Sequence, residues 1–173
     1  MSDISVKEVL EQIPAFVKHI EFELKGLGID VKAYPVDHVC FRVKTWAEYE
    51  KYKIEFSKVG KLLSEAQIGG RPIATYQFHQ AIKAGDRLIP CIELPAPKAG
   101  KEYPTALEHC EFVISQSFVS FAAVNSGLAW DWAGSKKVFN PELGLQLAPG
   151  LAVKFHHMSL MEVIRLEESA KQS

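Results

Sequence analysis

The chain has 173 residues, of which 47% are hydrophobic and 24% are charged, a globular balance that excludes a largely disordered chain. Its 20 basic and 21 acidic side chains leave a formal net charge of −1, which argues against binding nucleic acid or a membrane surface through overall charge. Three cysteines without CxxC spacing do not indicate a disulfide framework. The first residues lack a secretory signal, and no apolar run approaches the ~20 residues that cross a bilayer, so we expect a soluble, cytoplasmic protein.

Four helices are predicted in chain order. Apolar residues recur at helical spacing over 4–28, which predicts an N-terminal helix in which Pro14 is a candidate break. Thr45 with Glu48 is a capping-box pair, in which each side chain caps the other residue's backbone N–H, and a second such pair opens the C-terminal segment. The helices predicted after the first span 46–59, 118–125 and 160–171.

Strand-like segments fill the spaces between these helices and fall into two similar halves. A stretch rich in proline and glycine, residues 95–104, separates the halves, and each reads as strand, helix and three strands. The halves open alike, with DHVCF at 37–41 and EHCEF at 108–112, which predicts a duplication. The predicted strands are 36–43, 61–68, 71–79, 87–94, 107–114, 128–132, 143–148 and 151–156.

Side chains of a strand point alternately to opposite faces of a sheet. One face of the predicted strands is apolar, as with Val39 and Phe41, and can pack beneath helices. A solvent-exposed face usually recruits lysine, glutamate, threonine and serine, whereas three histidines and a glutamate, one from each of four strands, indicate ligands of a first-row metal. The polar face carries His38, Arg42, Arg71, Gln77, Glu93, His109, Glu111, Lys154 and His156.

We therefore predict that His38, Glu93, His109 and His156 bind a divalent metal ion. A lone strand histidine is more often structural, but His38 and His109 take equivalent places in the repeat, which favours ligation. Glu93 lies between two apolar residues, where a buried carboxylate needs a cation or a basic partner. Glu93 and Glu111 are also the candidate general bases for catalysis.

Basic side chains share this polar face. Arg42, Arg71 and Lys154, together with Gln77, are predicted to bind a small anionic ligand such as a carboxylate or a phosphate. Pairing of the arginines with Asp37, Glu93 or Glu111 is an alternative that the sequence leaves open.

Six short motifs carry a resemblance to a known family. With them the chain resembles the YecM-like family, within the vicinal oxygen chelate superfamily of glyoxalase, bleomycin-resistance and dihydroxybiphenyl dioxygenase proteins. The resemblance spans residues 37–156 and is weakest between 115 and 150. The motifs are DHVCFR at 37–42, GRPI at 70–73, ELPAP at 93–97, YP at 103–104, EH at 108–109 and KFH at 154–156.

The resemblance implies an α+β fold in which two βαβββ modules form a curled mixed sheet around a central cavity, with extra helices at both ends. It implies a single domain over 1–173. The expected parts are an N-terminal helical segment at 1–35, a first module at 36–97, a second module at 105–157 and a C-terminal helix at 159–173.

Metal ligands of the superfamily come from the first and fourth strands of each module, which implies the same His38, Glu93, His109 and His156. Superfamily enzymes often have a carboxylate at the last place, so zinc, nickel, manganese and iron all stay candidates. The favoured function is a metal-dependent lyase, isomerase or epimerase acting on a small anionic metabolite. The alternatives are a non-haem iron oxygenase and a non-catalytic protein that binds a metal or a small ligand. No nucleic-acid or membrane partner is expected, and a homodimer is one state that the resemblance allows.

Overall fold

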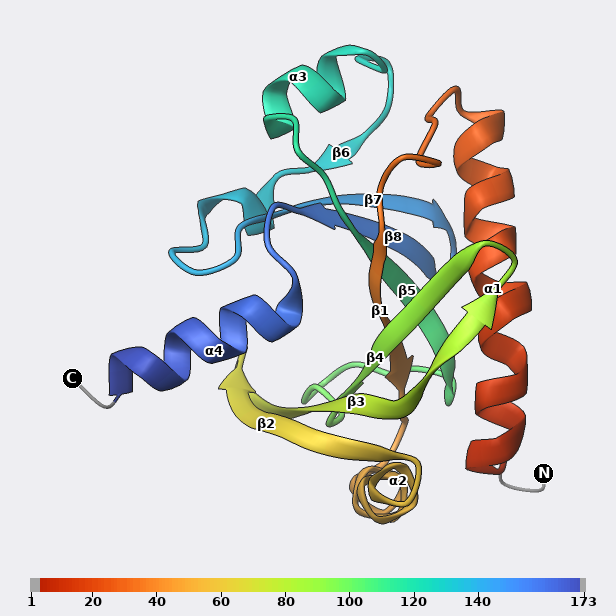
Figure 1. Cartoon of the computed structure of the whole chain (residues 1–173), viewed down its shortest axis with the longest axis vertical. Coiled ribbons are helices and arrows are strands. Elements are labelled where there is room, and N and C mark those ends of the chain that lie inside the picture. The colour runs from red at the N-terminus through yellow and green to blue at the C-terminus, as the bar shows by residue number, and fades with distance from the viewer. Residues whose placement is uncertain (1–3, 172–173) are drawn as a thin grey trace.

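A computed structural model of the chain describes residues 4–171, an eight-stranded mixed sheet that curls without closing and four α-helices (Figure 1). Residues 1–3 and 172–173, the ends of the predicted N-terminal segment and C-terminal helix, lie outside the described range. In chain order the elements are α1 (Val6–Gly26), β1 (Val36–Arg42), α2 (Trp46–Ser57), β2 (Gly60–Ile68), β3 (Arg71–Ala84), β4 (Arg87–Pro95), β5 (Ala106–Val113), α3 (Phe118–Ala123), β6 (Trp130–Asp131), a 3₁₀ turn (Ala133–Lys136), β7 (Glu142–Ala148), β8 (Leu151–His156) and α4 (Leu160–Lys171).

The strand order β2-β3-β4-β1-β5-β8-β7-β6 confirms the α+β fold of two βαβββ modules. Within each module the first and fourth strands pair in parallel, β1 with β4 and β5 with β8. The antiparallel ladder between β1 and β5 joins the modules, with His38 opposite Glu111 and Cys40 opposite His109. This ladder is symmetric about the Val39–Cys110 pair, so the modules are related by an approximate two-fold axis through the middle of the sheet.

Helix α1 is one continuous helix, as predicted, and the candidate break at Pro14 is not present. The Ser5–Glu8 capping box fixes its start, because Ser5 Oγ accepts from Glu8 N and Glu8 Oε2 accepts from Ser5 N. Val9, Ile13, Val17, Ile20 and Leu24 are fully buried at helical spacing. Burial of this stripe offsets the hydrogen bond that Pro14 cannot donate.

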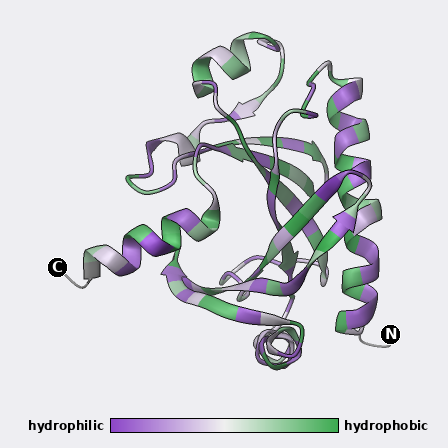
Figure 2. Cartoon of the chain, in the orientation of Figure 1, coloured by the Kyte–Doolittle hydropathy of each residue, from purple (hydrophilic) through white to green (hydrophobic). Residues whose placement is uncertain are grey.

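The sheet has an apolar face, on which helices pack, and a polar face on its opposite side. Both α1 and α2 pack on strands of the sheet, and the banding of α1 in Figure 2 shows its apolar side alternating with its polar side. Val39, Phe41, Phe112 and Phe155 lie fully buried beneath the helices, as the alternation predicted. The opposite face of β1 and β5 is buried as well, although it carries ionisable side chains.

Two strands differ in length from the prediction by more than one residue. Strand β3 continues past residue 79 to Ala84, because Ile82 to Ala84 pair with Arg87 to Ile89 in a hairpin that turns at Gly85. Strand β6 has only two residues instead of five. Among the described residues, no helix is long and apolar enough to cross a membrane.

Candidate metal centre

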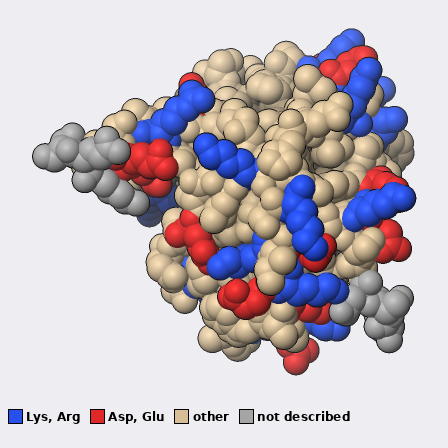
Figure 3. Space-filling view, turned by 60° about the horizontal axis from the view of Figure 1, so that its bottom comes forward, with Lys and Arg blue, Asp and Glu red and all other residues tan. Residues whose placement is uncertain are grey.

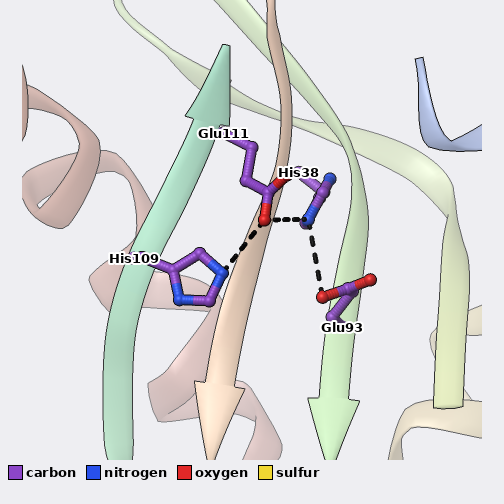
Figure 4. Close-up of side chains that lie close together, drawn as sticks. All are labelled: His38, Glu93, His109 and Glu111. Atoms are coloured by element: carbon purple, nitrogen blue, oxygen red, sulfur yellow. Dashed lines mark hydrogen bonds and ion pairs between the residues drawn. The ribbon is translucent and has the colours of Figure 1, made fainter. Parts of the chain in front are cut away.

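Four ionisable side chains from three neighbouring strands converge at the middle of the sheet. His38 comes from β1, Glu93 from β4, and His109 and Glu111 from β5 (Figure 4). One nitrogen or oxygen atom of each lies within 4.8 Å of those of the other three. Strand pairing produces this cluster, because Cys40 pairs with both Glu93 and His109, and His38 pairs with Glu111.

The spacing of these atoms suits an ion held between them. His38 Nε2 lies 3.4 Å from Glu111 Oε1 and 3.6 Å from Glu93 Oε2, and His109 Nε2 lies 3.2 Å from Glu111 Oε1. Ordinary N–H···O hydrogen bonds measure about 2.7–3.2 Å, so only the His109 contact falls in that range. When two ligand atoms each lie about 2.0–2.1 Å from a tetrahedral ion, they lie about 3.4 Å from each other. All three distances in the cluster are close to this value.

Each histidine is oriented by a carboxylate next to it in the sequence. His38 Nδ1 lies 2.9 Å from Asp37 Oδ2, and His109 Nδ1 lies 2.7 Å from Glu108 Oε2. Because a carboxylate can only accept, each Nδ1 carries a proton and each Nε2 is directed toward the cluster. His38 Nε2 is buried and has no hydrogen-bond partner among the described residues, as expected of a ligand atom.

The electrostatics of the cluster favour a positive charge between the side chains. Burial alone lowers the pKa of His38, but the carboxylates of Glu111 and Glu93 raise this pKa well above its usual value. Burial disfavours ionised Glu111, but the Lys154 ammonium and His38 hold its pKa well below the usual range. The residues present therefore fit a divalent cation, which the two carboxylates would balance in charge.

The structure places His156 outside this group of four. His156 is fully buried and belongs to a neighbouring group with Asp37 and His38. Its Nε2 lies 3.5 Å from Asp37 Oδ2 and 3.4 Å from Glu111 Oε2. Glu111, which we predicted as a general base, takes the place in the cluster that we had expected of His156, and metal ligation by either residue stays a prediction.

The modules differ at the position of the fourth-strand carboxylate. In the first module Glu93 of β4 pairs with Cys40, and in the second Lys154 of β8 pairs with Glu111. The approximate two-fold axis therefore relates Glu93 to Lys154, and Cys40 to Glu111. Alignment of the repeats at 37–41 and 108–112 already gives Glu111 the position that is equivalent to Cys40. The sequence therefore indicated that the second module has a carboxylate where the first has a cysteine.

The side chains predicted to bind an anion are partly engaged within the protein. Arg42 Nε lies 2.5 Å from Glu108 Oε2, and its guanidinium lies 4.5 Å from the centre of the Tyr103 ring. This carboxylate differs from the partners that we had considered for the arginine. Burial disfavours ionised Glu108, but His109 and Arg42 lower its pKa to about 2.

Of the remaining three residues, Arg71 and Gln77 lie on β3 and Lys154 contacts the cluster directly. Arg71 Nη1 donates to the carbonyl of Ala96 at 3.0 Å. Gln77 of β3 pairs with Cys91 of β4, on the face that carries Glu93. Lys154 Nζ lies 3.2 Å from Glu111 Oε1. Anion binding by these side chains stays a prediction.

A cavity of about 780 Å³ lies away from the cluster, between the second half of α1 and the β3–β4 turn. Lys18, Lys25 and Arg87 line it together with acidic residues, and Arg87 is already paired with Glu21. The described residues that line it include no histidine or cysteine. Basic and acidic side chains are likewise interspersed on the face drawn in Figure 3. We therefore take the strand cluster as the candidate site.

The paired βαβββ modules and their curled sheet define a protein with the vicinal oxygen chelate fold. The family described as YecM protein matches residues 5–167, and the chain belongs to this family. Protein YecM of Escherichia coli (strain K12) is 25% identical over 181 residues, which cover 95% of this chain and 95% of that protein.

Two solved structures show the same fold. A structural-genomics target is 24% identical and superposes with a TM-score of 0.79 over 94% of this chain and 92% of its own. A single-substitution variant of Streptomyces coelicolor methylmalonyl-CoA epimerase, in complex with 2-nitronate-propionyl-CoA, is 11% identical. It superposes with a TM-score of 0.51 over 72% of this chain and 94% of its own.

Proposed function

We propose that this protein binds a divalent metal ion through His38, Glu93, His109 and Glu111, and that it is a metal-dependent lyase, isomerase or epimerase for a small anionic metabolite. One observation carries the proposal. Two buried histidines, each fixed by a carboxylate at Nδ1, direct Nε2 toward two further carboxylates at 3.2–3.6 Å. The shared fold with an epimerase supports the reaction class.

A bound divalent ion would supply Lewis-acid chemistry, in which it polarises a substrate oxygen. Glu93 is the better placed carboxylate for moving a proton. It contacts one imidazole and its side chain is 15% exposed, whereas Glu111 is 4% exposed and contacts three imidazoles and Lys154. Glu93 can therefore turn toward a substrate at a lower cost in lost contacts. Lys154 and Arg71 would attract the anionic end of the substrate.

A second candidate is a non-haem iron oxygenase. Two histidines and one carboxylate are the ligand set of many ferrous oxygenases, and the cluster contains such a set if one glutamate is released. Ferrous-dependent oxygen consumption would favour this candidate. Tight binding of a small anion without turnover would favour the non-catalytic alternative.

The first test is the metal content of untagged protein purified without chelator and measured by inductively coupled plasma mass spectrometry. We expect near-stoichiometric metal in the wild type, and loss of at least nine-tenths of it in the double variant His38→Ala/His109→Ala. His79→Ala is the matched control, because His79 is exposed and lies far along β3 from the cluster. Its metal content should equal that of the wild type.

The proposal fails if the wild type holds no metal and takes up none when zinc, nickel, manganese or ferrous ion is added. It also fails if the double variant keeps the wild-type amount of metal while folding normally by circular dichroism.

A further inference from the structure

His156 presents a buried nitrogen that the cluster of four does not use. Its Nδ1 donates to the carbonyl of Met158, so its Nε2 is left for another partner. The residue is fully buried, and Nε2 has no hydrogen-bond partner among the residues that the structure describes. A buried polar atom without a partner is destabilising, so its position needs an explanation.

The atoms in front of His156 Nε2 are two carboxylate oxygens. Asp37 Oδ2 lies at 3.5 Å and Glu111 Oε2 at 3.4 Å, both beyond the usual range of a hydrogen bond. These distances repeat the spacing in the first cluster, and they again match about 3.4 Å between two ligands of one tetrahedral ion.

Glu111 belongs to both groups through different oxygen atoms. Its Oε1 faces Nε2 of His38 and of His109, whereas its Oε2 faces Nε2 of His156. An ion in the first cluster therefore leaves Oε2 free to bind a second ion. Such a bridging carboxylate is the usual way in which a protein holds two metal ions about 3.5–4 Å apart.

We propose that His156 Nε2, Asp37 Oδ2 and Glu111 Oε2 form a second cation position beside the first, with Glu111 as the bridge. The mixed nitrogen and oxygen donors suit zinc, manganese or ferrous ion. The same Asp37 Oδ2 also accepts from His38 Nδ1 and from the backbone N–H of Leu160, both at 2.9 Å. The second position therefore connects the first cluster to the start of α4. This inference rests on the proposed function, because it requires the first ion.

The test is a titration of metal-free protein with Zn²⁺, followed by isothermal titration calorimetry and by metal analysis after equilibrium dialysis. We expect two equivalents of zinc in the wild type and one in His156→Ala. His157→Ala is the matched control, because this neighbouring histidine binds the carbonyl of Ile114 and stacks on Phe118 instead. It should bind two equivalents.

A second readout uses Mn²⁺ and electron paramagnetic resonance. Two ions bridged by Glu111 should give a spin-coupled spectrum in the wild type, and His156→Ala should give the six-line spectrum of a single ion. If His156→Ala fails to fold by circular dichroism, His156→Gln replaces it, since glutamine keeps the volume and the polar end of the side chain.

One equivalent of zinc in the wild type overturns this inference and leaves the proposed function standing. A loss of that single equivalent in His156→Ala would then place His156 among the ligands of one ion. No zinc in the wild type overturns the proposed function, and the second position with it.

Discussion

Lys154 brings a positive charge to the carboxylate that both histidines of the cluster share. Its Nζ lies 3.2 Å from Glu111 Oε1 and 3.3 Å from Glu142 Oε1. The approximate two-fold axis relates Lys154 to Glu93, so the second module has an ammonium where the first has a carboxylate. An ion bound to Glu111 and the Lys154 ammonium would therefore compete for the same oxygen atom.

We predict that Lys154→Met raises the affinity for zinc at the first position by at least tenfold, about 1.4 kcal/mol, because it removes a like charge close to the ion. Isothermal titration calorimetry on metal-free protein measures the change. Lys154→Arg keeps the charge and should bind zinc as the wild type does. Lys137→Met is the second control, since Lys137 pairs with Glu142 alone among the described carboxylates. A fall in affinity in Lys154→Met would mean that the lysine acts mainly by holding Glu111 in place.

The alternation of the strands predicted which residues share the polar face, but not which of them meet. His38, Glu93 and His109 converge as their positions on neighbouring strands suggested. The β5–β8 register pairs Glu111 with Lys154 and places His156 two residues further along. Glu111 therefore joins the cluster, whereas His156 lies beside it in a neighbouring group with Asp37 and His38. Strand register depends on contacts between distant segments, so a single sequence does not contain it in readable form.

Among the elements, α2 is fastened to the sheet by a charged contact with β2. Glu65 of β2 accepts from Tyr49 Oη at 2.7 Å and from Lys53 Nζ at 2.9 Å, and both donors belong to α2. Lys53 and Tyr49 together lower the pKa of Glu65. A carboxyl whose pKa is lowered on folding stabilises the protein above its unfolded pKa of about 4.3, and this contribution is lost as pH falls through the folded pKa.

We predict that Tyr49→Phe lowers the free energy of unfolding by about 1 kcal/mol at pH 7, because it removes a hydrogen bond to an ionised carboxylate. The loss should shrink at an acidic pH below the lowered folded-state pKa of Glu65, where this carboxyl takes up a proton. Urea denaturation followed by far-ultraviolet circular dichroism at both pH values measures it. Tyr34→Phe is the control, since Tyr34 Oη accepts from the neutral amide of Gln116, and its effect should not depend on pH. Equal losses for Tyr49→Phe at both pH values would contradict the prediction.

Most helices and strands could be predicted from the sequence. The differences at α1 and β3 share a physical cause. Capping residues and helical spacing located α2 and α4 to within two residues. The continuity of α1 at Pro14 and the length of β3 were not settled by the sequence, because each depends on partners elsewhere in the chain. The sheet beneath α1 holds that helix together at Pro14, and β4 supplies the pairing for the last residues of β3.

In the whole molecule, several contacts tie the two modules into one structure. The β1–β5 ladder runs directly between them, and α1 packs on β3 of the first module and on β5, β7 and β8 of the second. The buried apolar residues of both modules form one continuous cluster. The single domain expected over 1–173 remains a prediction, and cooperative unfolding is its measurable consequence.

We predict that both modules unfold in one transition, because neither can lose its strands without exposing the shared core. Tryptophans report on each module separately, since Trp46 opens α2 of the first module and Trp130 lies in β6 of the second. The variant Trp130→Phe/Trp132→Phe keeps the first reporter, and Trp46→Phe/Trp132→Phe keeps the second. In guanidinium denaturation the fluorescence midpoint of each variant should coincide with the circular dichroism midpoint of the same variant. The midpoints of the two variants should also agree with each other, after correction for any change in stability that the substitutions cause. If the fluorescence and circular dichroism transitions separate in either variant, the modules unfold independently, and the chain comprises two domains joined at the β1–β5 ladder.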